Sequence, residues 1–422
     1  GDKIDEVLLL KMNGPNTYTA EDVLELQCHG GPGVIEKILR LLVRQGARLA
    51  APGEFTRRAF ENGRIDLAQA EAVADLINAR AGQSGKAALF QLEGRLSKSI
   101  TGIRKELLNL LAHIEVTFDY PEHDMEAATN SLVSQALEGI SKKIHHLADS
   151  FNKGRILREG INTVITGRPN VGKSTLLNSL SGYNRAIVTE IPGTTRDIIE
   201  EYIDIRGLPL RLIDTAGIRE TKDTIEKIGV SLARKEMKRA DLILFILDAS
   251  EGIYKQDNDL FEEISKLDSR CIVILNKADL ANKADLYSLW EKIKGKGYPV
   301  VITALCNTSG GCAFDSINCQ DSDSGLLNSG QSELEEMIYE MFSSGMFDIN
   351  NEALITNVRH KDLVDKTLVA CHSALHESDA GKTLDCVAID IGTALAYLGE
   401  ITGETVTADL LEEIFSRFCI GK

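Results

Sequence analysis

The sequence predicts a multidomain protein, in which an α/β domain is inserted into a helical domain and a small α/β unit precedes both. Strand-like runs alternate with helical segments in the middle of the chain, whereas apolar residues recur at helical spacing on either side of it. The first residues mix two strand-like runs with one amphipathic helix. We expect the small α/β unit at 1–62, the helical domain at 63–157 and 344–422, and the inserted domain at 158–343.

The inserted domain is expected to hold a mainly parallel sheet covered by helices on both faces, because its strands and helices alternate. The strand-like runs are INTVIT, EEYIDI, LRLID, DLILFILD, RCIVILN and PVVIT. The two flanking helical stretches would each lack a sizeable core if they were separate, so we expect them to form one domain. Their apolar stripes comprise Leu67, Ala70, Val73 and Ile77; Ile103, Leu107, Leu110, Leu111 and Ile114; and Leu410, Leu411, Ile414, Phe415 and Phe418.

Composition narrows the class of protein. Among 422 residues, 47 Lys and Arg stand against 63 Asp and Glu, and this net charge of −16 argues against a protein that coats nucleic acid by bulk charge.

No apolar run approaches the roughly 18 residues of a membrane span, and the opening GDKIDEVLLLKMNG does not fit a signal peptide. The eight cysteines lack both the close C-x-x-C pairs of a zinc ribbon and the density of a secreted disulfide scaffold, so we expect a reducing compartment. Because the chain opens with Gly, we expect an N-terminal portion to be absent.

A phosphate-binding loop (P-loop) is predicted at GRPNVGKS, residues 167–174, between a strand-like and a helical run. Its glycines allow backbone N–H groups to surround phosphate oxygens, and the helix N-terminus adds a favourable dipole. The ammonium of Lys173 neutralises phosphate charge, and the hydroxyl of Ser174 is a ligand for Mg²⁺. The expected nucleotide contacts here are Asn170, Val171, Gly172, Lys173, Ser174 and Thr175.

Two later segments complete the predicted nucleotide site, and the second of them indicates that the nucleotide is GTP. The DTAG segment begins at Asp214, the last residue of the strand-like run LRLID. Asp214 is expected beside the magnesium ion, and the Gly217 N–H is expected near the γ-phosphate. The NKAD segment begins at Asn276, the last residue of the strand-like run RCIVILN. Its Asp279 carboxylate is expected to accept hydrogen bonds from the N1–H and the exocyclic amine of guanine, donors that adenine does not offer. Residues 303–305 would complete the base pocket. The expected contacts are Asp214, Thr215, Ala216, Gly217, Asn276, Lys277, Ala278, Asp279, Thr303, Ala304 and Leu305.

The segment TEIPGTTRD, residues 189–197, is a candidate switch loop. The Thr195 hydroxyl is a second Mg²⁺ ligand when the γ-phosphate is present, and leaves the ion after hydrolysis. Residue 218 is Ile rather than the Gln that orients water in Ras-like enzymes, so the catalytic group must lie elsewhere. The expected contacts are Thr189, Glu190, Ile191, Pro192, Gly193, Thr194 and Thr195.

Taken together, these motifs resemble the tRNA modification GTPase family called MnmE or TrmE. The resemblance rests on GRPNVGKST, IVTEIPGTTRD, DTAGIRE, NKAD and the terminal FCIGK. It extends through GPNTYTAEDVLELQCHGGPG and APGEFTRRAFENGRIDLAQAEA, and so covers nearly the whole chain. It implies an N-terminal folate-binding domain, a discontinuous helical domain and an inserted GTPase domain, which agrees with the organisation predicted above.

The resemblance also implies a K⁺ ion in place of an arginine finger. Its ligands would be the Asn170 side chain, the backbone carbonyls of Thr189 and Ile191, and the side chain of Thr194. A cation there offers positive charge where negative charge develops during hydrolysis. The family's catalytic glutamate falls on Glu226, which would orient the attacking water; without the resemblance, Glu226 is an ordinary acidic residue at a helix start.

A folate, 5-formyl- or methylene-tetrahydrofolate, is the third implied ligand, and its contacts fall on Glu25, Arg64 and Lys422. Family members often carry Lys where this chain has Arg64, and the family's glycine-rich opening motif is not in the sequence. Cys419 matches the cysteine of the family's terminal C-x-G-K, which the modification needs. The sequence equally allows Cys419 to be a buried apolar thiol beside Phe418.

The implied activity is K⁺-stimulated, Mg²⁺-dependent GTP hydrolysis by a homodimer. With an FAD-dependent partner of the MnmG or GidA family, in a heterotetramer, such proteins build an aminomethyl or carboxymethylaminomethyl group at carbon 5 of the tRNA wobble uridine from a folate one-carbon unit. We expect a cytoplasmic location, or a mitochondrion or plastid for a eukaryotic source, and no membrane partner. The alternative is a regulatory switch in ribosome assembly, like Era and Der-like GTPases, although no KH-type G-x-x-G loop follows the GTPase domain.

Two further features carry no predicted site. His372 and His376 have the i, i+4 spacing of helix-borne metal ligands, but no Glu follows the first His, so we expect surface or interface histidines. The Gly-, Ser-, Asn- and Asp-rich segment 307–331 is expected to be a mobile loop. The spacing of Cys306, Cys312 and Cys319 matches no metal geometry.

Overall fold

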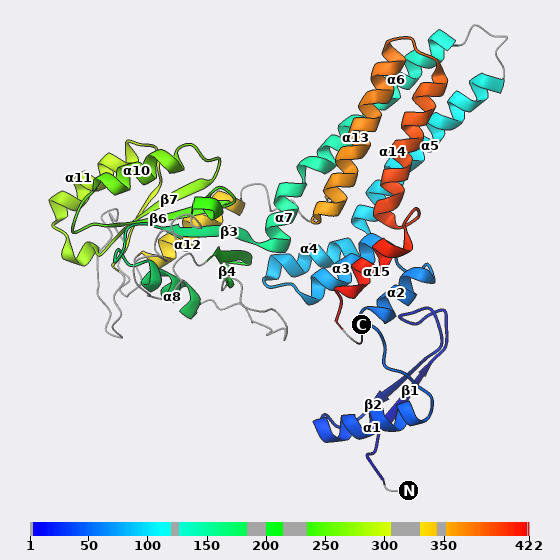
Figure 1. The fold of residues 1–422 in the computed structure, drawn as a ribbon, viewed down its shortest axis with the longest axis horizontal. Helices are drawn as coiled ribbons and strands as arrows, with labels where there is room; N and C mark the ends of the chain where they lie inside the picture. The colour runs from blue at the N-terminus through cyan, green and yellow to red at the C-terminus, as the bar shows by residue number, and fades with distance from the viewer. Residues whose placement is uncertain are drawn as a thin grey trace, which may run out of the picture. The chain divides into compact units, whose positions relative to one another are not determined.

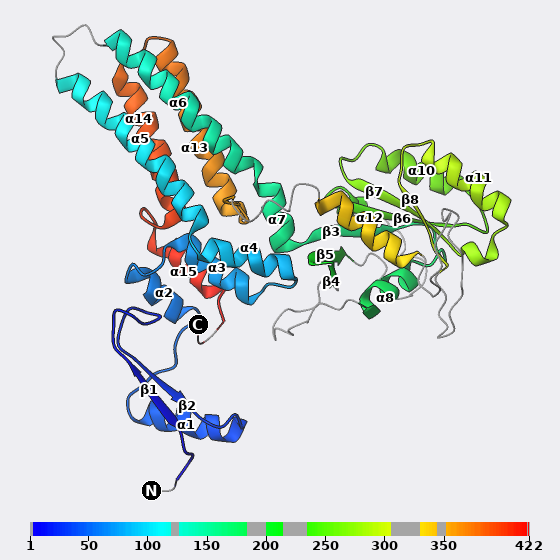
Figure 2. The same ribbon diagram turned by 180° about the vertical axis from the view of Figure 1, so that it is seen from behind.

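The computed structural model describes residues 3–119, 126–183, 200–213, 234–304, 330–343, 352–419 and 421. The chain divides into two compact units (Figures 1 and 2). Unit 1 comprises Gly1–Asn78, Ala87–Gly154 and Glu352–Lys422, and unit 2 comprises Ala79–Lys86 and Arg155–Asn351. The predicted fold class is confirmed, because an α/β domain interrupts a helical domain and a small unit with strands precedes both.

The N-terminal part of unit 1 is a two-stranded antiparallel sheet with two helices. Its elements are Leu8–Met12 (β1), Val23–Gln27 (β2), Pro32–Arg44 (α1) and Glu54–Glu61 (α2). β1 pairs with β2 so that Leu10 lies opposite Glu25. Helix α1 begins at Pro32, a residue suited to the first turn because its missing N–H would have no partner there.

The rest of unit 1 is helical. Its elements are Leu67–Ile77 (α3), Gly82–Leu92 (α4), Arg95–Asp119 (α5), Glu126–Asp149 (α6), Phe151–Glu159 (α7), Val358–Asp379 (α13), Leu384–Thr402 (α14) and Ala408–Ser416 (α15), and the first turn of α4 and most of α7 belong to unit 2. α5, α6, α13 and α14 lie side by side (Figures 1 and 2). One core joins Ile114 and Ile144, before the insertion, with Val364 and Ile391, after it. Neither stretch could bury these side chains alone.

Unit 2 is built on a six-stranded sheet. Its elements are Ile161–Thr166 (β3), Lys173–Tyr183 (α8), Glu200–Ile205 (β4), Leu208–Ile213 (β5), Leu242–Asp248 (β6), Lys255–Ile264 (α10), Arg270–Asn276 (β7), Ala278–Leu280 (η1), Lys283–Lys294 (α11), Val300–Ile302 (β8) and Gln331–Ser343 (α12). The strand order is β4-β5-β3-β6-β7-β8. All neighbours pair in parallel except β4 with β5, so the predicted mainly parallel sheet is confirmed.

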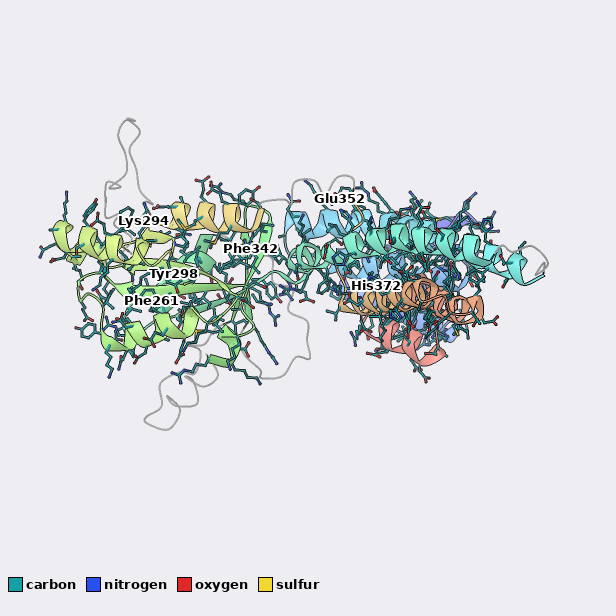
Figure 3. All side chains as sticks on the ribbon, turned by 90° about the horizontal axis from the view of Figure 1, so that it is seen from above. Phe261, Lys294, Tyr298, Phe342, Glu352 and His372 are labelled. Atoms are coloured by element: carbon teal, nitrogen blue, oxygen red, sulfur yellow. The ribbon has the colours of Figure 1, made fainter. Side chains whose placement is uncertain are left out.

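Helices cover both faces of this sheet. All seven residues of β6 are buried, which requires cover on each side because successive side chains point to opposite faces. α10 and α11 pack on one face, where Phe261 contacts Phe245 and Tyr298 with ring centroids 4.8 and 5.5 Å apart (Figure 3). α8 lies on the opposite side from α10 (Figure 1). Among the described residues, no helix has the length and apolar character needed to cross a membrane.

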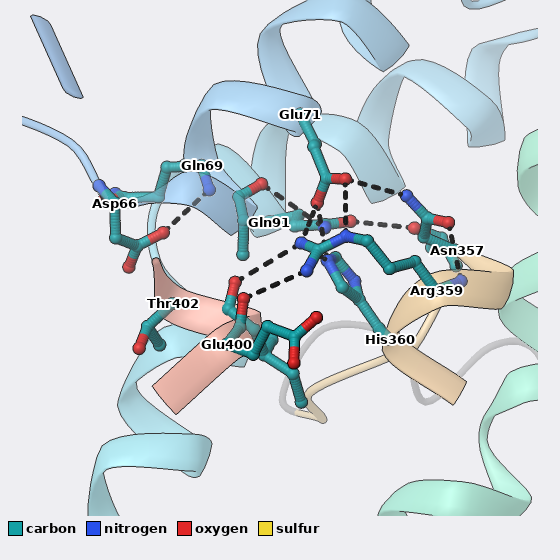
Figure 4. A network of polar contacts seen from close by, with 12 residues as sticks. Asp66, Gln69, Glu71, Gln91, Asn357, Arg359, His360, Glu400 and Thr402 are labelled. Carbon is teal, nitrogen blue, oxygen red and sulfur yellow. Dashed lines mark hydrogen bonds and ion pairs between the residues drawn. The ribbon is translucent and has the colours of Figure 1, made fainter. Parts of the chain in front are cut away.

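A buried polar network joins the two halves of the helical domain (Figure 4). The Glu71 carboxylate on α3 accepts hydrogen bonds from Arg359, at 2.8 Å from Nη2 and 3.1 Å from Nε. Nε2 of His360 lies 2.6 Å from Glu71 Oε2, and Asn357 Nδ2 lies 3.2 Å from Oε1. Arg359 Nη1 also donates to the carbonyl of Glu400 near the end of α14, at 3.0 Å. Glu71 and Arg359 together thereby join α3, the start of α13 and the end of α14.

Glu71 is ionised although it is shielded from water. Only 7% of Glu71 is exposed, and His360 is fully buried. Burial acts to raise the pKa of Glu71, but attraction and hydrogen bonding from His360, with the bonds from Arg359, outweigh it and lower the pKa to about 2. The folded-state pKa is therefore below the ordinary value of 4.5. Glu71 stabilises the fold at higher pH, and this contribution is lost as the pH falls from about 4.5 toward 2.

Replacing Glu71 with Gln should lower the free energy of unfolding by roughly 3–5 kcal/mol at neutral pH, because Arg359 would lose its buried counter-charge. Chemical denaturation followed by circular dichroism measures the change. The difference from the wild type should shrink as the pH falls toward 3.

A matched control is Glu106→Gln. Glu106 pairs with Lys143 at 2.6 Å, but the two side chains are 43% and 55% exposed, so this substitution should have little effect on stability. Equal losses in the two variants would contradict the special role of the Glu71 network.

Candidate nucleotide-binding site

The sequence motifs meet at the carboxyl ends of neighbouring parallel strands in unit 2. The loop of residues 167–172 follows β3, Asn276 is the last residue of β7, and Thr303 follows β8. Parallel strands present their carboxyl ends at one edge of a sheet, which is where α/β proteins bind ligands. The predicted nucleotide contacts that the structure describes are therefore brought together at this edge.

Two glycines let the P-loop pass close to the sheet. Gly167 has φ +146°, and a Cβ there would lie 2.4 Å from the carbonyl oxygen of Ile246 in β6. Gly172 has φ +108°, and a Cβ there would lie 2.2 Å from Nδ2 of Asn276. Both positions require glycine, for the conformation and for the space. Between them, Asn170 adopts the left-handed conformation with φ +62°, which Asn tolerates.

Lys173 and Ser174 begin helix α8, whose N-terminus follows the loop. The Lys173 ammonium donates to the carbonyls of Gly167 and Arg168, at 2.8 and 2.7 Å, and so lies across the loop. Burial lowers the pKa of Lys173. A phosphate in the loop would act in the opposite direction and favour the ammonium. Ser174 is exposed, so its hydroxyl is accessible at a helix N-terminus, where anions and their metal ions bind.

Asn276 connects the P-loop to the base-recognition segment. Its side chain is buried, and Nδ2 donates to the carbonyl of Val171 at 2.9 Å. Its Oδ1 accepts from the hydroxyl of Thr303 at 3.1 Å. The Thr303 backbone in turn accepts from the Ala278 N–H at 3.2 Å. One buried amide thus ties together the loops that follow β3, β7 and β8.

Asp248, at the end of β6, is a residue that the sequence motifs do not identify. Its carboxylate forms an ion pair with Lys277, with Oδ2 and Nζ 2.6 Å apart, and accepts from Ser250 Oγ at 2.6 Å. Burial acts to raise the pKa of Asp248, but the hydrogen bonds from Lys277 and Ser250 lower it below its usual range. The ion pair orients Lys277, whose backbone has φ +59°. An Asp closing an otherwise apolar buried strand is the signal that could have identified it.

Among the remaining predicted nucleotide contacts, the structure describes Asp279 and Ala304. Asp279, in η1, is exposed, as a residue that receives a base must be, and Ala304 is half-buried next to Thr303. The other predicted residues of the nucleotide and metal sites lie outside the described residues, as does segment 307–329. These are Thr189, Glu190, Ile191, Pro192, Gly193, Thr194, Thr195, Asp214, Thr215, Ala216, Gly217, Glu226 and Leu305.

Unit 1 contains a separate cavity of ≈ 560 Å³. Arg64 and Tyr18 line it together with Gly421. Arg64 Nη1 donates to the Tyr18 carbonyl at 2.9 Å, and its guanidinium lies 5.1 Å from the centre of the Tyr18 ring. Of the predicted folate contacts, Arg64 therefore lies at the cavity, Glu25 lies exposed on β2 outside the described lining, and Lys422 is outside the described residues.

Cys419 is exposed, so the alternative of a buried apolar thiol is wrong. Phe415 in α15 and Phe418 just after it pack against Leu67, whereas the Cys419 side chain lies outside this cluster and its carbonyl accepts from the Gly53 N–H at 3.2 Å. His372, labelled in Figure 3, and His376 are exposed. No group of three or more His, Cys, Asp and Glu suited to a metal ion occurs in the part of the chain that the structure describes.

The fold and the site together define the class as a P-loop GTPase. A P-loop follows a parallel strand and opens a helix, and an NKAD segment stands two strands away at the same sheet edge. Known proteins identify the particular family. The family model described as the MnmE helical domain matches residues 67–419, and that of the GTP-binding protein TrmE N-terminus matches residues 1–64. The chain belongs to the tRNA modification GTPase MnmE family.

Relatives match along the whole chain. The tRNA modification GTPase MnmE of Acetivibrio thermocellus is 49% identical over 422 residues, which is 100% of this chain and 87% of that protein. The protein of the same name from Bacillus velezensis is 46% identical over 420 residues, 99% of this chain and 86% of that protein. Among solved structures, the G domain of the T. maritima FeoB iron transporter is 27% identical to this chain. The match spans 43% of this chain and 97% of the FeoB chain, with a TM-score of 0.29.

Replacing Asn276 with Ala should weaken nucleotide affinity by roughly tenfold or more, because the P-loop carbonyl of Val171 would lose its donor and Thr303 its acceptor. Titration with a fluorescent GDP analogue measures the affinity. The graded control is Thr303→Val, which removes only the hydroxyl and keeps the bond to Val171, so its loss should be smaller. A larger loss in Thr303→Val than in Asn276→Ala would contradict the proposed connection.

Proposed function

We propose that this protein hydrolyses GTP with Mg²⁺ and K⁺ and, together with an FAD-dependent partner of the MnmG or GidA family, modifies the wobble uridine of tRNA. The product would carry an aminomethyl or carboxymethylaminomethyl group at carbon 5, built from a folate one-carbon unit. The observation that carries the proposal is the buried Asn276 amide, which joins a P-loop to a guanine-recognition segment in a chain of this family. A ribosome-assembly switch is the competing outcome of the test below.

The residues at the P-loop fit the proposed cations. Asn170 and Ser174 are both exposed and carry the oxygen ligands that Mg²⁺ and K⁺ prefer. Ser174, with Thr195, would hold Mg²⁺, and Asn170, with the segment around Thr194, would hold K⁺. The two ions would supply positive charge where the phosphates become more negative during hydrolysis. Glu226 would orient the attacking water.

The cavity in unit 1 supports the proposed folate site. It brings the cation of Arg64 and the exposed ring of Tyr18 to the same space as Gly421, two residues after the exposed Cys419. A guanidinium suits the carboxylates of a folate, and an aromatic ring suits its flat heterocycle. A site here would place the one-carbon donor near the thiol. In a homodimer, GTP-driven movement of the GTPase domains would control this chemistry in the cytoplasm or an organelle.

GTP turnover should be roughly tenfold or more faster in K⁺ than in Na⁺ at equal ionic strength, because K⁺ replaces the missing arginine finger. Asn170→Ala should abolish the difference. Asn178→Ala, on the exposed face of α8, is the matched control and should keep it. Phosphate release in the two salts measures both effects, and equal wild-type rates would refute the K⁺ assignment.

Cells that lack the protein should lose the wobble-uridine modification, and the wild-type gene should restore it. A Cys419→Ser variant should hydrolyse GTP at the wild-type rate yet fail to restore the modification, because Cys419 belongs to unit 1 and the GTP site to unit 2. Cys386→Ser, at a half-buried thiol of α14, is the control and should restore it. Mass spectrometry of tRNA nucleosides gives the answer. Unchanged modification in the absence of the protein would favour the ribosome-assembly alternative.

A further inference from the structure

Arg168, the second residue of the P-loop, has no predicted contact with the nucleotide, yet its side chain is only 12% exposed. Its Nε donates to Oδ1 of Asp257 at 3.0 Å, and its Nη1 donates to Oε2 of Glu251 at 3.1 Å. The guanidinium carbon lies 4.0 Å from the centre of the Tyr254 ring. All three partners come from the loop before α10 and its first turn, so one short segment encloses the guanidinium.

The partner segment is itself fixed. Asp257 is fully buried, and its Oδ2 also accepts from the Tyr254 backbone N–H at 2.9 Å, which caps the start of α10. One turn later, Phe261 packs edge-to-face against Phe245 of the central strand β6, with ring centroids 4.8 Å apart. Asp257 therefore belongs to a helix that packs on the sheet, and Arg168 is hydrogen-bonded to this helix.

Arg168 in turn restricts the first half of the P-loop. It stands between Gly167, which lies against β6, and Pro169, whose ring limits the backbone. Asn170 follows in the left-handed conformation, with φ +62°. The carbonyl of Arg168 accepts from the Lys173 ammonium at 2.7 Å. Because the Arg168 side chain is held, fewer backbone conformations are accessible to the P-loop residues that lead to the phosphate-binding N–H groups.

The P-loop thus has two supports, one for each half. Asn276 holds the second half through the Val171 carbonyl, and Arg168 holds the first half through α10. We propose that Arg168 is a positioning residue for GTP binding, which keeps the loop in the shape that receives the phosphates. This inference goes beyond the proposed function, because it requires neither K⁺, folate, tRNA nor a partner protein.

Arg168→Gln should weaken binding of a fluorescent, non-hydrolysable GTP analogue by about tenfold, because the loop would then take the binding shape in only a fraction of molecules. The measurement uses the full chain in Na⁺ buffer with Mg²⁺. The same variant should also have a lower thermal midpoint, because Asp257 would be left buried without its counter-charge. Affinity at the wild-type level would overturn the proposal.

The double variant Arg168→Gln, Asp257→Asn separates positioning from stability. It removes both charges, so its thermal midpoint should return most of the way to the wild-type value, while the roughly tenfold loss of affinity persists. If affinity returns together with stability, Arg168 is only a structural residue and the proposal is wrong.

Arg234→Gln is the matched control. Arg234 pairs with Glu263 at the other end of α10, with Nη2 and Oε1 2.6 Å apart, but it is 56% exposed and lies outside the P-loop. This variant should keep both the affinity and the thermal midpoint, and a tenfold loss of affinity in it would overturn the assignment to Arg168. The binding readout is independent of turnover, so a failure of the K⁺ or tRNA predictions leaves this test unaffected.

Discussion

The side-chain amide of Asn276 lies where three strand ends meet, and the nucleotide site depends on it. Through one donor and one acceptor it sets the distance between the P-loop at Val171 and the segment around Thr303. The phosphates and the base are the two ends of a nucleotide. The protein groups that contact them must therefore stay a constant distance apart. A buried amide with both bonds made is stiff, because breaking either bond would leave a polar atom unsatisfied away from water.

The helical domain also depends on contacts between segments that lie far apart in the sequence. Its core uses side chains from both sides of the insertion, and Glu71 binds residues that lie almost three hundred positions further along the chain. The partners of this carboxylate therefore lie on the far side of the inserted domain in the sequence. The network stands directly after residue 352, where the chain re-enters unit 1, so the conformation of the returning segment is fixed at its entry.

Local motifs are what the sequence reveals well. The P-loop, the alternation of strands and helices, and the apolar stripes of the helices are read from neighbouring residues, and the mainly parallel sheet confirms the predicted alternation. The Asp248–Lys277 pair, the Glu71 network and the bond from Arg168 to Asp257 each join residues whose closeness depends on the finished fold. Exposure of Cys419 also escaped prediction, because it depends on where a short helix ends against its neighbours.

Competition between GTP and ATP for a fluorescent GDP analogue tests most directly whether this edge of the sheet is a guanine-specific site. A carboxylate at Asp279 can accept two hydrogen bonds from guanine, whereas adenine would leave it without a donor. The geometry predicts that GTP displaces the analogue at a concentration at least roughly a hundredfold lower than ATP does. Displacement by the two nucleotides at similar concentrations would contradict it.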